Sequence, residues 1–116
     1  PVWRFRANQA IISSPALAKG VIYIGSADGN LYALDASNGR LRWKFETGGQ
    51  VNSSPAVAGE AVYVGSADGY LYAVETRSGK LGWKFKTQGP IVSSPLVHEQ
   101  VVYFGSLDGR LYALSA

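Results

Sequence analysis

A tryptophan recurs at positions 3, 43 and 83, and most of the chain repeats with it at the same interval of 40 residues. The tripeptide Ser-Ser-Pro returns once per interval, and the segment 23–33 returns at 63–73 and 103–113 without insertion or deletion. A fixed period of this length indicates one supersecondary unit placed beside copies of itself. Residues 1–116 are therefore expected to form a single repeat domain.

Each period contains four short runs rich in β-branched and aromatic residues, which predict strands. In the second period these runs cover residues 51–58, 61–66, 70–75 and 81–87. The connections Ala67-Asp68-Gly69, Asn38-Gly39 and Ser78-Gly79 carry the residues that tight hairpin turns require. No segment shows helical periodicity. The pattern predicts an all-β fold, a β-propeller of four-stranded antiparallel blades of 40 residues, with three blades per chain.

The residue types also predict where each strand lies within a blade. The second and third runs are apolar on both faces, as expected between neighbouring blades. The Ser-Ser-Pro run contains a proline, which cannot donate to a sheet ladder, and its small serines suit the inner rim of a propeller. The tryptophan-bearing run is then outermost, where basic side chains protect a sheet edge. Eight of the 11 basic residues lie on or beside it: Arg4, Arg6, Arg40, Arg42, Lys44, Lys80, Lys84 and Lys86.

Composition excludes several classes of function. The chain has no cysteine, so disulfides, thiolate metal sites and cysteine nucleophiles are absent. No apolar run approaches the roughly 20 residues of a membrane helix, so membrane insertion is not expected. The net charge of +3 is mild, and the basic residues are spread around the predicted circumference rather than clustered in one stripe. We therefore expect no nucleic-acid binding.

The order of the strands predicts how a ring would close. Residues 2–7 form an outermost strand, and residues 91–115 form the other three strands of a blade. Three blades are too few for a ring, which typically holds 4–8. We predict a homodimer in which strand 2–7 of each copy completes the blade formed by 91–115 of the other, which gives a closed ring of six blades. Alternatively, the segment is excised from a longer propeller, as a start without methionine inside a repeat suggests.

The stretches Ala33-x-Asp35-x-x-Asn38-Gly39-x-x-x-Trp43 and Ala73-x-Glu75-x-x-Ser78-Gly79-x-x-x-Trp83 resemble a known blade motif. The motif is Ala-x-Asp-x-x-Thr-Gly-x-x-x-Trp of the quinoprotein-type (pyrroloquinoline-quinone-like, PQQ-like) propeller repeats, and the resemblance covers essentially the whole chain. It departs mildly where Asn38 and Ser78 replace threonine and Glu75 replaces aspartate. The resemblance implies that Trp3, Trp43 and Trp83 dock between adjacent blades. It also implies a bacterial or archaeal extracytoplasmic protein.

The family that the motif resembles is functionally divided. Some of its members are quinone-dependent alcohol or sugar dehydrogenases, which hold calcium beside a catalytic aspartate. Others are non-catalytic scaffolds, such as the lipoprotein of the bacterial outer-membrane assembly machinery, or sensor domains of kinases. The fold alone does not choose between these roles.

The polar residues favour a structural interpretation over catalysis. Asp28, Asp68 and Asp108 recur once per repeat at hairpin turns, where an aspartate caps its own backbone, and this spacing keeps them apart. His98 is the only histidine, and nothing in the sequence suggests a group that would activate Ser13 or Ser14 as a nucleophile. We therefore expect no enzyme activity, no catalytic residues, no cofactor and no metal site.

Loops that vary within an otherwise uniform repeat are the remaining candidates for function. The family resemblance implies that the loops between outermost and innermost strands, and the Asp-Gly turns, lie on one face. The candidate interaction face comprises Gln9, Asn30, Gln50, Tyr70, Gln88 and Arg110. Tyrosine and arginine are common in binding hot spots, although exposed turns also vary without function. The sequence predicts a protein-interaction, scaffold or sensor module; the alternatives are small-molecule or carbohydrate binding at the channel mouth, or a fragment of a quinone-dependent dehydrogenase.

Overall fold

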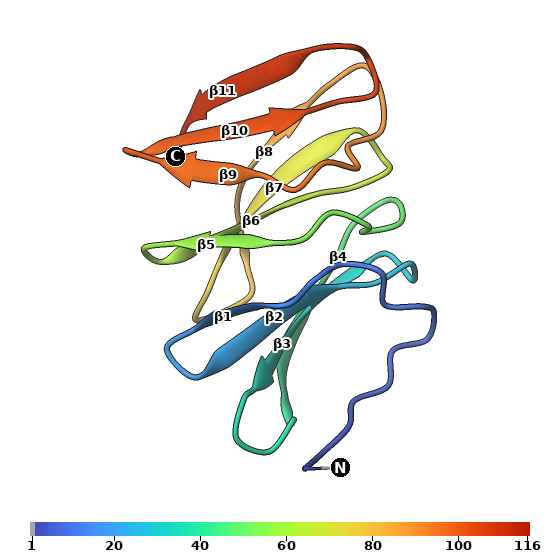
Figure 1. The fold of residues 1–116 in the computed structure, drawn as a ribbon, viewed down its shortest axis with the longest axis vertical. Coiled ribbons are helices and arrows are strands. Elements are labelled where there is room, and N and C mark those ends of the chain that lie inside the picture. Colours follow the sequence, from blue (N-terminus) through green and yellow to red (C-terminus); the bar gives the residue numbers. More distant parts are fainter. Residues whose placement is uncertain (1) are drawn as a thin grey trace.

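The computed structural model describes residues 2–116, which form three antiparallel sheets and no helix (Figure 1). The first sheet contains β1 (Ala16–Ala18), β2 (Val21–Gly25), β3 (Asn30–Asp35) and β4 (Leu41–Glu46). The second contains β5 (Ala56–Ala58), β6 (Ala61–Gly65), β7 (Tyr70–Glu75) and β8 (Leu81–Lys86). The third contains β9 (Leu96–His98), β10 (Val101–Gly105) and β11 (Leu111–Ser115). We call them blades 1, 2 and 3.

The blades stand side by side along the chain, as the predicted propeller fold requires (Figure 1). Each complete blade has its strands in sequence order, and every neighbouring pair is antiparallel. Neighbouring blades adjoin along β1, β5 and β9, which are therefore the inner strands. The β-propeller prediction is confirmed as an arc of blades. None of the described residues belongs to a helix long and apolar enough to span a bilayer.

The turns follow the predicted glycine chemistry. Gly29, Gly69 and Gly109 have φ angles of 93°, 90° and 87° in the second hairpin of each repeat. Gly39 and Gly79 have φ angles of 74° and 73° in the next one. Glycine adopts this left-handed region without steric cost, which explains why it closes each of these turns.

The innermost strand is shorter than the sequence indicates. Residues 51–58 were expected to be extended throughout, but the strand covers only Ala56–Ala58. Before it, the Ser53 hydroxyl accepts a hydrogen bond from Gly65 N at 2.9 Å. A side-chain oxygen here replaces the backbone carbonyl that would accept this bond in a regular sheet. Pro55 lacks the N–H that would extend the backbone ladder. The strand is shortened for this reason.

A second serine joins neighbouring blades at the inner rim. Ser14 N donates to Ser54 Oγ at 2.8 Å, and Ser54 N donates to Ser94 Oγ at 2.9 Å. These residues are one repeat apart, so the bonds run from blade to blade around the axis. The predicted place of the serines at a crowded inner rim agrees with this geometry.

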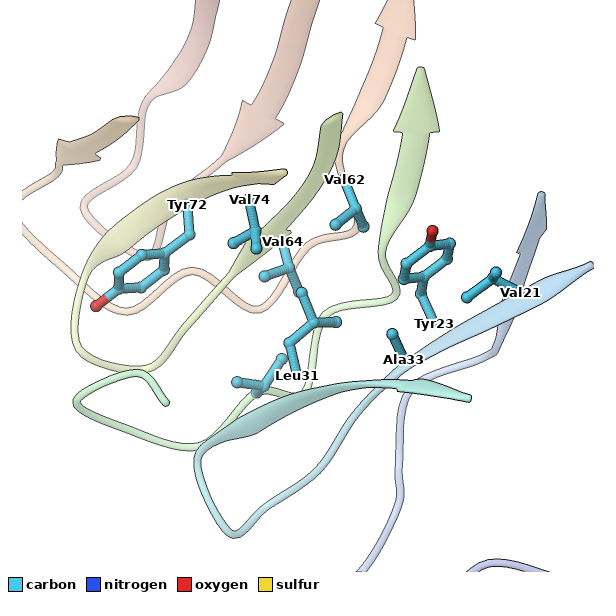
Figure 2. Close-up of a cluster of buried hydrophobic side chains, with 9 residues drawn as sticks. Val21, Tyr23, Leu31, Ala33, Val62, Val64, Tyr72 and Val74 are labelled. Carbon is cyan, nitrogen blue, oxygen red and sulfur yellow. The ribbon is translucent and has the colours of Figure 1, made fainter. Parts of the chain in front are cut away.

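The core lies between blades rather than within them. Figure 2 shows Leu31 and Ala33 of β3 facing Val62, Val64 and Val74 of blade 2. All of these side chains are fully buried. Burying one large aliphatic side chain contributes about 1.5–3 kcal/mol, so each blade depends on its neighbour for stability.

Residues 2–7 follow the course expected of an outermost strand but pair with no strand in this chain. Trp3, Phe5 and Ala7 instead pack against the apolar face of blade 1. The Phe5 and Tyr32 rings meet edge to face with centroids 5.0 Å apart, as Phe45 meets Tyr72 at 5.3 Å. The segment therefore lies on blade 1 as β4 lies on blade 2. That it completes the blade formed by 91–115 remains a prediction.

Candidate interaction face

The candidate interaction face is built from two sets of loops that bond to each other. The loop that leaves an outer strand lies against the β2–β3-type turn of the next blade. Ala67 N donates to Gln50 O at 2.8 Å, and Leu107 N donates to Pro90 O at 2.9 Å. The equivalent bond in blade 1 joins Ala27 N to Ala10 O at 2.8 Å. The loops that carry Gln9, Gln50 and Gln88 thus lie against the turns that precede Asn30, Tyr70 and Arg110, respectively.

Five of the six predicted residues are accessible. Gln9, Gln50, Gln88 and Arg110 are exposed, and Tyr70 is half-buried. Asn30 is only 8% exposed, and its Nδ2 donates to the Tyr32 hydroxyl at 3.4 Å. Asn30 therefore supports the face from beneath and offers little surface of its own.

Tyr70 forms the aromatic centre of this face. Lys84 Nζ lies 4.5 Å and Lys86 Nζ lies 4.8 Å from the centroid of its ring. Lys86 Nζ also donates to Asp68 O at 2.9 Å. Among residues 2–116, the lysine or arginine that pairs with a carboxylate is Arg42, with Asp35, so neither Lys84 nor Lys86 is neutralised by a carboxylate. Blade 2 presents an aromatic ring flanked by two positive charges, which suits an acidic partner.

A shallow groove lies next to Tyr70. It is an open hollow of about 180 Å³ between the turn 67–69 and the loop 86–90, and Gln88 is part of its lining. Blades 1 to 3 stand side by side, so their loops follow one another in a row (Figure 1). A row of this kind suits an extended protein surface better than a small molecule.

The recurring aspartates hold the two sets of loops together. Asp28 Oδ1 accepts from Asn30 N at 2.9 Å, which is the turn cap expected from the sequence. Asp28 Oδ2 accepts from Asn8 N at 3.2 Å and from the Tyr32 hydroxyl. The same arrangement recurs in Asp68 with Tyr70 N, Gly48 N and Tyr72, and in Asp108 with Arg110 N, Gln88 N and Tyr112. We call each of these an aspartate latch.

In two of the latches, hydrogen bonds to the carboxylate lower the pKa of the aspartate, Asp28 or Asp108. For Asp108, the hydrogen bond from the Tyr112 hydroxyl is the main reason that its pKa lies below the ordinary value. For Asp28, burial opposes ionisation, but the bonds from Tyr32, Asn30 N and Asn8 N prevail and lower the pKa. Burial and the bond to Asp68 raise the pKa of Tyr72 far above that of a free tyrosine. A general base near neutral pH would need a raised carboxyl pKa, so the lowered pKa values of Asp28 and Asp108 do not favour that role.

Acid should therefore weaken the loops of this face. A carboxyl whose folded pKa is depressed stabilises the fold above its unfolded pKa, about 3.9, and loses that contribution as the pH falls through the lower folded value. We expect the unfolding temperature to drop between about pH 4 and pH 2. Thermal unfolding followed by circular dichroism at several pH values measures this.

The substitution Asp28→Asn tests whether the latch causes the acid sensitivity. Asp28→Asn should lower the unfolding temperature at pH 7, since its partners lose an ionised acceptor. It should also flatten the acid limb, which is the fall of the unfolding temperature between about pH 4 and pH 2. Glu46→Gln, on the exposed outer strand β4, is the control and should leave the acid limb as it is. An unchanged acid limb in Asp28→Asn would show that the latch has no part in acid unfolding.

Two of the three repeat tryptophans lie against the blade that follows them. Trp3 Nε1 donates to Ala36 O and Trp43 Nε1 donates to Thr76 O, both at 2.9 Å. Their rings cover Gly39 and Gly79, where an added Cβ would stand 2.4 and 2.5 Å from the ring. Trp83 lies beside residues 114–116. A shared docking role for all three is a proposal that extends this geometry.

Ser13 and His98, which were considered from the sequence as possible catalytic residues, contact the following groups. Ser13 Oγ accepts from Gly25 N at 2.8 Å and donates to Gly25 O at 3.2 Å. His98 Nε2 lies 3.0 Å from Glu99 Oε1, and both side chains are exposed. Within residues 2–116, no three His, Cys, Asp or Glu side chains gather as they would around a metal ion.

The inner rim, where a channel mouth would lie, contains one buried polar atom without a partner. Asn52 Oδ1 has no hydrogen bond within the part of the chain that the structure describes, while Asn52 Nδ2 donates to Gln50 Oε1 at 3.2 Å. Sequence reasoning included Gln50 in the candidate face but missed Asn52, because the other repeats carry apolar Ile12 and Val92 at this position.

Comparison with known proteins identifies the relatives of the chain. The family described as outer membrane protein assembly factor BamB matches residues 1–116. BamB from Moraxella catarrhalis is 28% identical, with a TM-score of 0.86 over 98% of this chain and 36% of that one. A quinohemoprotein alcohol dehydrogenase from Pseudomonas putida HK5 is 27% identical, with a TM-score of 0.88 over 98% of this chain and 20% of that one.

A more distant likeness concerns the fold alone. A europium-containing methanol dehydrogenase is 23% identical, with a TM-score of 0.76 over 87% of this chain and 22% of its own length. Comparison with curated protein sequences found no match. The chain thus spans about a third of the BamB structure and about a fifth of each dehydrogenase.

Proposed function

Because the chain belongs to the BamB family of PQQ-like propeller repeats, we propose that it is a non-catalytic module that binds another protein through its loop face. The observation that carries the proposal is the Tyr70 ring with Lys84 and Lys86 beside it, on loops that the aspartate latches hold in place. A preorganised aromatic and basic surface loses little entropy when it binds. The likeness to an outer membrane protein assembly factor supports a partner in that machinery.

The similarity to dehydrogenases suggests the competing function, that of a quinone-dependent enzyme. In this chain the repeat aspartates are occupied by turn and tyrosine bonds, which favours a scaffold over a quinone enzyme. Adding pyrroloquinoline quinone with Ca²⁺ and scanning the visible spectrum tests this choice. A bound chromophore with alcohol-dependent bleaching would overturn the scaffold proposal.

Site-specific photo-crosslinking tests the interaction face. A photoreactive phenylalanine at position 70 should give a discrete protein adduct in cells that produce the protein, identifiable by mass spectrometry. The same group at Asn38, which is exposed in the turn between β3 and β4, is the control. Adducts at position 38 alone, or the same adducts at both positions, would contradict the proposed face.

We further propose that two copies of the chain close one six-bladed ring. Each end of the arc has a position that lacks the neighbour found at the contacts between blades, and the two positions are complementary. Gly25 and Gly65 are covered by Val51 and Ile91, whereas at Gly105 the nearest atoms to an added Cβ belong to Ser93 in its own blade. Ile11 occupies the repeat position of Val51 and Ile91 but is 41% exposed. A second copy would place its Ile11 on Gly105.

The outer edge of blade 3 supports the same pairing. β11 bonds to β10 on one side, whereas β3 and β7 each have a second neighbour, β4 and β8. Leu111 is 78% exposed, while Leu31 and Leu71 at the same repeat position are fully buried. Residues 2–7 of the second copy would fit this edge, since they repeat the Trp-x-Phe pattern of β4 and β8.

Light scattering measures the predicted association. We expect a mass of twice 12.4 kDa at micromolar concentration, and a shift toward the single-chain mass for Leu111→Lys, which places a charge at the contact. Leu41→Lys, at an exposed leucine of the outer strand β4 and away from both ends of the arc, is the control and should leave the dimer intact. A folded chain at 12.4 kDa would refute the dimer and favour completion by further repeats.

A further inference from the structure

A cavity lies between blades 1 and 2, outside the interaction face. Its volume is 420 Å³, within the roughly 300–1,000 Å³ of small-molecule sites. It lies at the turns β1–β2, β5–β6 and β7–β8, which are at the strand ends opposite the latched loops. It is lined by Ala18, Lys19, Val21, Tyr23 and Arg42 of blade 1, and by Val57, Gly59, Glu60, Thr76 and Arg77 of blade 2.

Three of the lining residues are cationic and one is anionic. Lys19, Arg42 and Arg77 supply the positive charges and Glu60 the negative one. Arg42 Nε donates to Asp35 Oδ1 at 2.6 Å, and its side chain remains half-exposed. A guanidinium has five N–H donors, so this one bond orients Arg42 and leaves its Nη groups to donate to a ligand. With Asp35 included, three positive and two negative charges leave a net charge of +1, which favours an anion.

The backbone places two of these cations in unusual positions. Trp43 pairs with Ala33 and Leu41 pairs with Leu34, so Arg42 is the extra residue of a β-bulge. Bulges redirect side chains and are enriched beside functional sites. Lys19 has a φ of 50°, in the left-handed region that a lysine adopts at a cost.

The second interface shows that packing does not require these charges. Between blades 2 and 3, Gly59 stands where blade 1 has Lys19, and Gly82 stands where it has Arg42. β8 has the same register shift as β4, so the backbone forms the bulge without arginine. The cations are therefore specific to one of two otherwise similar interfaces.

We propose that this cavity binds a small organic carboxylate, held by the guanidinium groups of Arg42 and Arg77. Arginine bonds to carboxylates with two parallel N–H donors, which gives both affinity and orientation. Val21 and Val57 provide an apolar wall for the rest of the ligand. Glu60 disfavours a dianion such as phosphate and accepts a hydrogen bond from a hydroxyl or ammonium group. The ligand class is thus a hydroxy acid, an amino acid or the carboxylate of a peptide end.

An NMR titration of the isotope-labelled chain tests this proposal. The probes are lactate and leucine as free carboxylates, trialanine as a peptide end, and inorganic phosphate. Saturable shifts of the Ala18, Val21 and Val57 amides are expected with carboxylates, with dissociation constants of about 1 mM or below. Phosphate should bind at least about 10-fold more weakly. Preference for trialanine over the free acids would identify a peptide end, and the reverse a free metabolite.

The repeat supplies variants that should fold. Arg42→Gly and Lys19→Gly install the residues of blade 2, and Arg77→Ser installs the Ser37 of blade 1. Arg42→Gly and Arg77→Ser should each weaken carboxylate binding about 10-fold, with unfolding curves as a check on folding. Lys44→Ala, at an exposed residue of β4 that does not line the cavity, should not change binding.

Three results would overturn the proposal. One is no saturable shift with any carboxylate up to about 50 mM. The second is unchanged affinity in Arg42→Gly and Arg77→Ser. The third is phosphate binding as tightly as the carboxylates. The cavity lies away from the Tyr70 face, so these outcomes are independent of the proposed protein-binding function.

Discussion

Replacing Trp43 with alanine should lower the free energy of unfolding by about 3–5 kcal/mol. The indole covers Gly79 of blade 2, donates from Nε1 to Thr76 O at 2.9 Å, and lies 5.9 Å from the Tyr23 ring. Its removal leaves a gap between two blades whose core is shared. Urea unfolding with linear extrapolation measures the loss.

Two further variants separate the causes of this loss. Trp43→Phe keeps much of the ring but removes the N–H, and should cost about 1–3 kcal/mol because Thr76 O loses its partner. Lys44→Ala, at the exposed neighbour on β4, should change stability by no more than about 0.5 kcal/mol. If Trp43→Ala cost as little as Lys44→Ala, blades 1 and 2 would not depend on this contact.

The fold was predictable because local signals and the repeat agree. The period of 40 residues and the glycines of the turns, such as Gly69 with its φ of 90°, define strands and hairpins in every repeat. The inner strand was predicted to cover 51–58 but begins only at Ala56, after Pro55. What replaces the ladder there is the Ser53 hydroxyl bond to Gly65 N, a long-range contact that residue types do not reveal.

The candidate site was predictable in outline only. The loop positions that differ between repeats were identified, but Asn30 is buried where Tyr70 and Arg110 are not, because a small amide fits under its own hairpin. The aspartates were predicted to cap turns, but their bonds to Tyr32, Tyr72 and Tyr112 were missed. The spacing Asp-x-x-x-Tyr in every repeat is the signal that could have shown them.

The cavity between blades 1 and 2 was not predictable at all. The sequence predicts that Arg42 and Lys80 both protect the edge of an outer strand. Only the register shift at Ala33 and Leu34 directs Arg42 toward blade 2. A bulge depends on pairing between strands, so it leaves no mark in the spacing of residue types.

Replacing Gly65 with alanine should cost about 1–3 kcal/mol or more through overpacking. An added Cβ would stand 2.1 Å from Ile91 Cγ2 and 2.8 Å from Ile91 Cβ, and Ile91 is fully buried. The glycine is therefore required for close approach between blades 2 and 3. In the double variant Gly65→Ala, Ile91→Ala the clash is removed, so the combined loss should be smaller than the sum of the single losses.

Gly105 is the matched control, because it holds the same position in blade 3 with no neighbouring blade in this chain. An added Cβ would meet Ser93 Oγ at 3.6 Å, an ordinary contact, so Gly105→Ala should change stability by no more than about 0.5 kcal/mol. If two copies close a ring, the same substitution should prevent Ile11 of the second copy from docking, and light scattering should show single chains. Measured on single chains, equal destabilisation by Gly65→Ala and Gly105→Ala would show that backbone preference, rather than contact between blades, requires glycine here. A Gly105→Ala chain that still dimerises would exclude Gly105 from the contact.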